Sequence, residues 1–309
     1  MNKNSGRFKL YNEAPLYQIF VSLVIIVGVG LTLTIILLIA GLFISGIDFS
    51  VLDKPAASLS IRDIAFMKYL LIVQDISLLV IPSIIILKLL KPESEAKLTG
   101  FRIPQAKEIF LVVILAFCLF PITSFTGQIN SAMHLPDWLS GVEQWMIRQE
   151  DKSDNLIESL IAAKTFPVMI LNLFLIAVLP AVGEELIFRG VFQKIFYNLL
   201  RSGHLAIWFS AILFSALHFQ FFGFIPRLIL GLVFGYLFFW SGSLWMPVIA
   251  HFVNNAFPVL LSYIQDNGHL KTQNEFPLWQ QAITMMLSVA ICMVILCYFR
   301  GKHISYKSL

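Results

Sequence analysis

The stretch that decides the fold is LPAVGEELIFRGVFQ, residues 179–193, because it places three charges inside an apolar run. Two adjacent carboxylates, Glu184 and Glu185, are followed four residues later by Arg189. An ionisable side chain at the centre of a membrane-spanning helix costs about 2.5–3.5 kcal/mol on insertion scales unless it has a partner. The charges therefore indicate a polar site inside a group of helices.

The rest of the chain has the composition of a membrane protein. Of its 309 residues, 58% are hydrophobic and 13% are charged, and the mean hydropathy is +0.82. Apolar stretches of about 20 residues, long enough to span about 30 Å of hydrocarbon, recur along the sequence. We predict an all-α polytopic membrane protein with about eight transmembrane helices and an active-site cavity within the bundle. The predicted helices are residues 18–45, 66–90, 109–130, 166–195, 205–221, 224–241, 245–264 and 278–299.

The net charge of +4 is explained by the positive-inside bias of the loops, so a nucleic-acid partner is not expected. The same bias predicts a multi-pass protein with both termini cytoplasmic. The expected location is a bacterial-type inner (plasma) membrane. We divide the chain into three segments. Residues 1–165 hold helices one to three and a surface helix, residues 166–265 hold helices four to seven with the charged stretch, and residues 266–309 hold helix eight and a cytoplasmic tail.

The surface helix is predicted from DWLSGVEQWMIRQE, residues 137–150, in the longest outer loop. Its apolar residues Trp138, Leu139, Val142 and Met146 recur at roughly helical spacing. Such a helix either lies on the membrane surface or packs against the spans as a short solvated helix.

Polar residues inside the predicted spans are rare and concentrate in the second half of the chain. Glu185 and Arg189 are four residues apart, which predicts an ion pair on one helix face and leaves Glu184 rotated by about 100°. His251 and Asn255 have the same spacing, so both project from one face of the seventh helix.

Other residues in the spans have simpler interpretations. Gly231 and Gly235, in GLVFG, are predicted to mark close helix packing. In the first half, Gln74 and Asp75 are predicted to link helices through a hydrogen bond or ion pair, since nothing nearby in the sequence completes a chemical site.

The second-half cluster has the groups that hydrolysis needs. A carboxylate with two imidazoles can hold and deprotonate a water, and a further imidazole or amide can donate to a developing oxyanion. No serine or cysteine stands in an obvious nucleophile motif beside these residues, so direct attack by water is favoured over an acyl-enzyme.

The ordered motifs EExxxR, FxxxH and HxxxN resemble those of the CPBP family of intramembrane proteases, which includes type II CAAX prenyl proteases and bacteriocin-immunity (Abi) proteins. The resemblance covers about residues 166–265. The matching residues are Glu184, Glu185 and Arg189, then Phe214 and His218, then His251 and Asn255.

This resemblance implies a role for each position. Glu184 and His218 would orient and deprotonate the attacking water, and His251 and Asn255 would line the oxyanion hole. Glu185 would brace the helix together with Arg189. The candidate catalytic residues are therefore Glu184, Glu185, His218, His251 and Asn255, supported by Arg189 and Phe214.

A zinc mechanism is the alternative, because Glu184, His218 and His251 make a His₂Glu ligand set with an open fourth position. In that case Glu185 would serve as the base. The cofactor expectation is accordingly none or zinc.

The function expected is that of an intramembrane endopeptidase acting on a peptide or protein substrate near the cytoplasmic side of the bilayer. One rival is a non-catalytic immunity or regulatory protein that uses the same polar cluster for binding. Another is a transporter, which is disfavoured because transporters place broken helices in two related halves.

The single-site hypothesis makes a geometric demand on the fourth predicted helix. We expect it to continue through the motif to about Leu200, with Glu184 several turns below the membrane surface. Glu184 must then lie within about 8 Å of the histidines, since the expense of burying it makes sense only with partners nearby.

Overall fold

The structure, a computed structural model, describes residues 9–47, 49–91, 100–268 and 276–302. In these ranges the regular secondary structure is helical, apart from an isolated bridge between Phe101 and Ser243. Among the described residues, seven helical spans are long and apolar enough to cross a membrane: Pro15–Ser45, Ile61–Leu89, Ala106–Ser131, Phe166–Leu200, Phe224–Ser241, Trp245–Asp266 and Leu278–Gly301. An eighth apolar helix, Gly203–Ala216, is shorter. The protein is thus a polytopic all-α membrane protein, as predicted.

Several spans are single α-helices. They are α1 (Pro15–Ser45), α4 (Ala106–Ser131), α9 (Gly203–Ala216), α10 (Phe224–Ser241), α11 (Trp245–Asp266) and α12 (Leu278–Gly301). Between the spans lie α5 (Ser140–Ile161) and the short 3₁₀-helices η1 (Leu10–Asn12), η2 (Phe49–Asp53), η3 (Ala56–Ser58) and η5 (Asp137–Leu139).

Two spans are composite and contain π-helical turns. The first consists of α2 (Ile61–Gln74), η4 (Asp75–Val80) and α3 (Ile81–Leu89). The second consists of α6 (Phe166–Asn172), η6 (Leu173–Val178), α7 (Leu179–Glu185), η7 (Leu186–Phe192) and α8 (Gln193–Leu200). The prediction that the helix carrying GEELIFRG continues to about Leu200 is confirmed.

The positions of two π-turns follow from proline. η4 ends just before Pro82 enters α3, and η6 ends just before Pro180 enters α7. Proline lacks an N–H, and its ring crowds the carbonyl of the preceding turn, so a locally widened turn accommodates it. The third π-turn, η7, follows Glu185 directly and contains Arg189. Such turns inside α-helices are frequent at functional sites.

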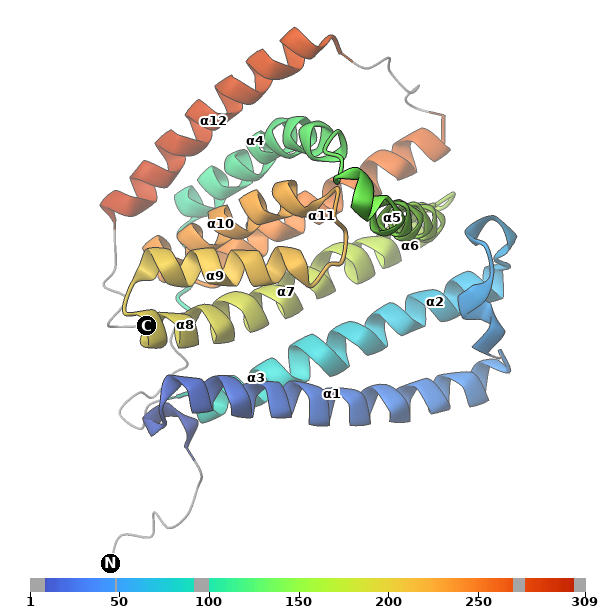
Figure 1. Ribbon diagram of the computed structural model, residues 1–309, viewed down its shortest axis with the longest axis horizontal. Coiled ribbons are helices and arrows are strands. Elements are labelled where there is room, and N and C mark those ends of the chain that lie inside the picture. The colour runs from blue at the N-terminus through green and yellow to red at the C-terminus, as the bar shows by residue number, and fades with distance from the viewer. Residues whose placement is uncertain (1–8, 48, 92–99, 269–275, 303–309) are drawn as a thin grey trace, which may run out of the picture.

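The bundle is arranged so that the composite span with the charges lies in its interior. Figure 1 shows α1, α2 and α3 along one edge, α12 at the opposite edge, and α6 to α11 between them. The start of α1, the end of α12 and the junction between α8 and α9 lie at the same end of the bundle. This arrangement suits the predicted topology, while the orientation of that end toward the cytoplasm stays a prediction.

The second span begins earlier than predicted, at Ile61 rather than at residue 66. Ser60 explains this start, because its hydroxyl accepts from the backbone N–H of Asp63, and the Asp63 carboxylate accepts from the Ser60 backbone N–H at 2.8 Å. This reciprocal pairing is a capping box, which satisfies the free donors at a helix start.

The fifth predicted helix, 205–221, is wrong at its C-terminal end, because α9 ends at Ala216. His218 lies in the turn that follows, and Phe219 has a left-handed backbone with φ of 53°. The His218 Nδ1 lies 2.7 Å from the Phe214 carbonyl, to which it donates. That carbonyl is among the last of the helix, where side-chain donors take the place of missing backbone partners. The histidine is therefore carried by a turn and not by a helix.

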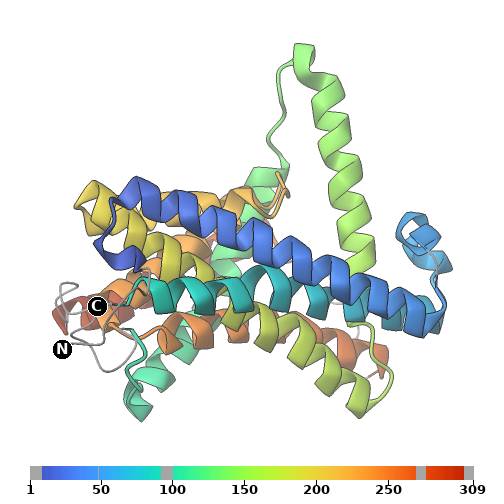
Figure 2. The same cartoon turned by 90° about the horizontal axis from the view of Figure 1, so that it is seen from below.

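The expected amphipathic helix is present as α5, which stands away from the bundle in Figure 2. It nevertheless touches the turn between α9 and α10. Trp145 packs against Phe221 with ring centroids 5.9 Å apart, and the Glu150 carboxylate accepts from the Phe222 N–H at 3.0 Å. Whether α5 lies on the membrane surface stays a prediction, as does the division of the chain into three segments.

Candidate active site

The structure brings Glu184 and both motif histidines together inside the bundle. Glu184, on α7, has its Oε2 3.7 Å from the Nε2 of His251 on α11. The same oxygen is 4.0 Å from the Nε2 of His218, in the turn after α9. Both distances lie well within the limit of about 8 Å that the single-site hypothesis set. Three segments far apart in the sequence therefore meet at one carboxylate.

Glu185 faces a different set of partners. Its Oε1 accepts from Arg189 Nη1 at 2.8 Å and from His251 Nδ1 at 2.9 Å. Arg189 Nη2 also donates to the Gly231 carbonyl of α10 at 3.1 Å. The side chains of Glu185 and Arg189 are 0% and 1% exposed, so the predicted ion pair is present and fully enclosed.

Aromatic rings surround this ion pair. The Arg189 guanidinium lies over Phe214, 4.8 Å from the ring centroid, and over Phe234 at 5.5 Å. His251 stacks on Phe234 with ring centroids 5.2 Å apart, and Phe214 packs edge-on against His218 at 4.9 Å. A cation enclosed by ring faces is stabilised by their quadrupoles. Phe214 thus connects the ion pair to the histidine turn.

Close helix packing makes these contacts possible, as the glycines predicted. A Cβ on Gly231 would lie 3.0 Å from the Cβ of Ala211 on α9. A Cβ on Gly235 would lie 2.7 Å from a methyl group of Ile207. Without side chains at these positions, α10 approaches closely enough for its carbonyl at Gly231 to receive Arg189.

The hydrogen bonds of the histidines determine which nitrogen faces Glu184. His218 Nδ1 faces the Phe214 carbonyl and His251 Nδ1 faces the Glu185 carboxylate, so each Nδ1 faces an acceptor and carries a proton. Each Nε2 is then the atom directed at Glu184. The separations of 3.7 and 4.0 Å exceed hydrogen-bond length and suit a small group bridging the three side chains.

Asn255 is the one predicted residue for which the structure shows no contact with the cluster in the described ranges. It lies one turn beyond His251 on α11, is partly buried, and accepts from Asn254 Nδ2 at 3.4 Å. Its oxyanion role stays a prediction.

Two charged residues near the cluster were not predicted from the sequence. Asp75, assigned above to helix pairing, is buried at the start of η4 and interacts electrostatically with Glu184. Arg227, in the first turn of α10, interacts electrostatically with Glu184 and His218. Pro82, which follows Asp75 in the same span, was the available signal for an irregular helix there. No sequence motif indicated Arg227.

The zinc alternative depends on how the candidate ligand side chains are arranged. Within the described ranges, no group of three or more His, Cys, Asp and Glu residues is placed to hold a metal ion. Glu184, His218 and His251 are therefore not arranged as the predicted zinc ligands, and the chemistry below is derived without a metal.

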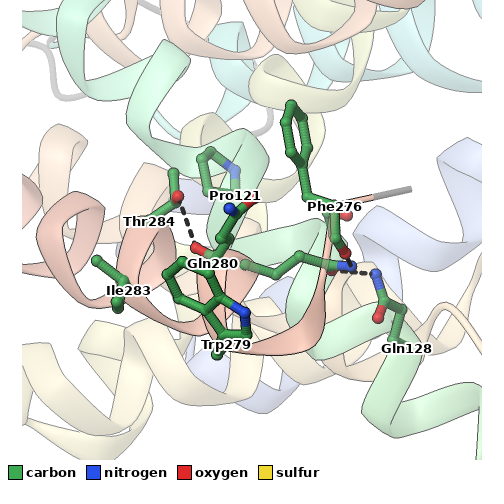
Figure 3. A pocket seen from close by; sticks show the side chains of 9 residues that line it. Pro121, Gln128, Phe276, Trp279, Gln280, Ile283 and Thr284 are labelled. Carbon is green, nitrogen blue, oxygen red and sulfur yellow. Dashed lines mark hydrogen bonds between the residues drawn. The ribbon is translucent and has the colours of Figure 1, made fainter. Parts of the chain in front are cut away.

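A cavity of about 730 Å³ opens elsewhere in the bundle, between α4 and α12 (Figure 3). Its lining is uncharged, with Trp279 and Phe276 beside the amides of Gln128 and Gln281, which hydrogen-bond to each other at 2.6 Å. It includes none of the motif residues. Because these amides and rings supply no base, the cavity has no equipment for hydrolysis.

Part of the chain is similar to a known protein family and to one bacterial protein. Residues 166–257 match the family model described as "Type II CAAX prenyl endopeptidase Rce1-like". The chain is also 31% identical over 89 residues to "Uncharacterized protein YpbD" of Bacillus subtilis (strain 168). That alignment covers 28% of this chain and 42% of the relative, so less than half of the relative's length is spanned. No solved structure matches the chain.

Proposed function

Since residues 166–257 form an Rce1-like domain and carry the CPBP motifs, we propose that the protein is an intramembrane endopeptidase that hydrolyses peptide bonds by direct attack of water. One observation carries the proposal. Glu184 Oε2 is buried, has no hydrogen-bond partner among the described residues, and lies near two imidazole Nε2 atoms at 3.7 and 4.0 Å. A buried carboxylate oxygen left in this state has a free acceptor site where a water can be held.

In the proposed reaction, a water donates its hydrogens to Glu184 and to the His218 Nε2. As the water oxygen bonds to the peptide carbonyl carbon, Glu184 takes one of its protons. The carbonyl becomes an oxyanion. When this tetrahedral intermediate collapses, the C–N bond breaks and the proton passes to the departing amine, giving a carboxylic acid and an amine as products.

His251 is proposed to act on the oxyanion. Its Nδ1 proton is directed at Glu185, so donation from Nε2 requires the doubly protonated imidazolium. Glu185, 2.9 Å from that Nδ1, would orient His251 as well as brace Arg189. Asn255 is proposed as the second donor.

The test compares wild type and Glu184→Gln in proteoliposomes supplied with a peptide library, with cleavage read by mass spectrometry. We expect the substitution to lower kcat/KM by about 10³-fold, within the range for loss of a general base. Glu158→Gln, on the exposed surface of α5, is the matched control and should stay within about threefold of wild type.

Treatment with a zinc chelator distinguishes the carboxylate mechanism from the zinc mechanism. We expect o-phenanthroline to leave the rate unchanged, because the proposed base is a carboxylate. Cleavage that persists in Glu184→Gln would refute the assignment, and inactivation by the chelator with rescue by zinc would transfer the role to a metal.

A further inference from the structure

The bundle contains a second, partly buried arginine whose bonding differs from that of Arg189. Arg227 lies in the first turn of α10, with its guanidinium packed over Gly223, where a Cβ would collide with it. Its Nη2 donates to the side-chain oxygen of Gln220, two residues beyond His218. Its Nη1 is buried and has no hydrogen-bond partner among the described residues.

The residues around Arg227 are acidic, but they do not pair with its guanidinium. Glu150 and Asp154 of α5 interact with it electrostatically, as does Glu184. None of these carboxylates forms an ion pair with Arg227 in the described part of the chain, and the Glu150 Oε2 is occupied by the Phe222 N–H. Arg189 also has a buried N–H without a hydrogen-bond partner among the described residues, at Nε, but its charge is paired with Glu185 at 2.8 Å. The Arg227 guanidinium therefore keeps a free donor, and it is close enough to Glu184 and His218 to interact with both electrostatically.

A buried guanidinium N–H without an acceptor costs free energy, which a suitable ligand recovers on binding. The planar fork of a guanidinium matches a carboxylate better than any neutral acceptor, and such bonds are roughly twice as strong as neutral ones. A substrate anion placed here would lie between the acids of α5 and the water-activating groups, with Arg227 offsetting their repulsion.

We propose that Arg227 is a specificity-determining residue that binds a carboxylate of the substrate close to the scissile bond. The carboxylate belongs either to the C-terminus of the peptide or to an Asp or Glu side chain next to the cleaved bond. This inference rests on the proposed endopeptidase function and adds a substrate class to it.

Paired peptide libraries in proteoliposomes test the inference and separate the two sources. One pair differs only in a C-terminal carboxylate or carboxamide, and the other differs only in Asp and Glu or Asn and Gln at flanking positions. We expect wild type to cleave one anionic set with about tenfold higher kcat/KM than its neutral partner, through KM. Arg227→Gln should bring that ratio to about 1 while cleavage of the neutral set persists. Arg148→Gln, on exposed α5, should leave the ratio unchanged.

Arg227→Lys is a second variant for the case in which Arg227→Gln does not fold, because lysine retains the positive charge. If Arg227→Gln cleaves nothing, a ratio retained in Arg227→Lys supports the inference and a ratio of about 1 overturns it. Equal cleavage of both partners by wild type, or a preference that survives Arg227→Gln, also overturns it. Failure of the proposed function looks different, since no peptide is then cleaved in a Glu184-dependent manner.

Discussion

Two neighbouring glutamates divide the site into sides with opposite properties. On one side, Glu185 is fully enclosed, and its Oε1 receives donors from Arg189 and His251. On the other side, Glu184 is 17% exposed, and its Oε2 lies 3.7 and 4.0 Å from two imidazole Nε2 atoms. The Oε2 atoms of both glutamates are buried without a hydrogen-bond partner among the described residues. Charge, residue type and position in the sequence are nearly identical, so the surroundings alone create the difference.

The two glutamates show how a membrane protein can hold a reactive charge. The Glu185 side contacts α10 and α11 through Arg189 and His251, and its charges offset one another. That arrangement is a rigid support, because each group is fixed by a partner on another helix. Glu184 Oε2 forms no hydrogen bond with the histidines, because their Nε2 atoms lie beyond bonding distance. We expect the reactivity of Glu184 to depend on the ion pair that fixes its neighbour.

Removing the cation of the Glu185–Arg189 ion pair should have the largest effect. We expect Arg189→Met to lower the free energy of unfolding by about 3–5 kcal/mol, since it leaves Glu185 buried and uncompensated. Unfolding by SDS in mixed micelles measures this. Lys54→Met removes the lysine of the Lys54–Asp63 pair at 3.0 Å, in which Lys54 is 41% exposed, and should cost less than about 1 kcal/mol. Equal stability of Arg189→Met and wild type would show that the Glu185–Arg189 ion pair is not a support.

The next test concerns the oxyanion side, where Asn255 has been proposed as a donor. Asn255→Ala should lower kcat about 10²-fold with KM nearly unchanged, which is the signature of a contact made only in the transition state. Asn254→Ala, one residue earlier on the same helix, should change kcat less than threefold. If the two substitutions have equal effects, the second donor must be sought elsewhere.

The sequence predicted those parts of the site that depend on local spacing. The Glu185–Arg189 pair follows from the helical repeat, and the extension of that span to Leu200 follows from the depth at which Glu184 must lie. Gly231 and Gly235 indicated close packing because small residues are the usual signature of it in membranes. Each inference used residues within one helix, where periodicity is reliable.

The parts that were missed depend on how separate helices align. Asp75 approaches Glu184 because η4 packs against α7 at Gly183, where a Cβ would meet the Cβ of Leu79 at 3.0 Å. Arg227 approaches through the turn between α9 and α10. His218 was placed on a helix because its own neighbours are apolar, whereas α9 ends early where His218 itself bonds the Phe214 carbonyl. Single-helix patterns carry no information on such register.

The smallest expected effect tests whether close helix packing supports the Glu185–Arg189 ion pair. Gly231→Ala would put a Cβ 3.0 Å from the Ala211 Cβ and 3.1 Å from its Cα. Backbone cannot yield as a flexible side chain does, so α9 and α10 must separate, at a cost of about 1–3 kcal/mol in unfolding free energy.

The control for Gly231→Ala is Gly28→Ala on α1, where nothing lies within 4 Å of the added Cβ. There the substitution should stabilise by about 0.5–1 kcal/mol, because alanine loses less backbone entropy in a helix. Separation of α9 from α10 would also draw the Gly231 carbonyl away from Arg189 and shift the turn that holds His218. Gly231→Ala should therefore lower kcat/KM as well as stability. Loss of stability with unchanged kcat/KM would show that the two sides of the site are independent.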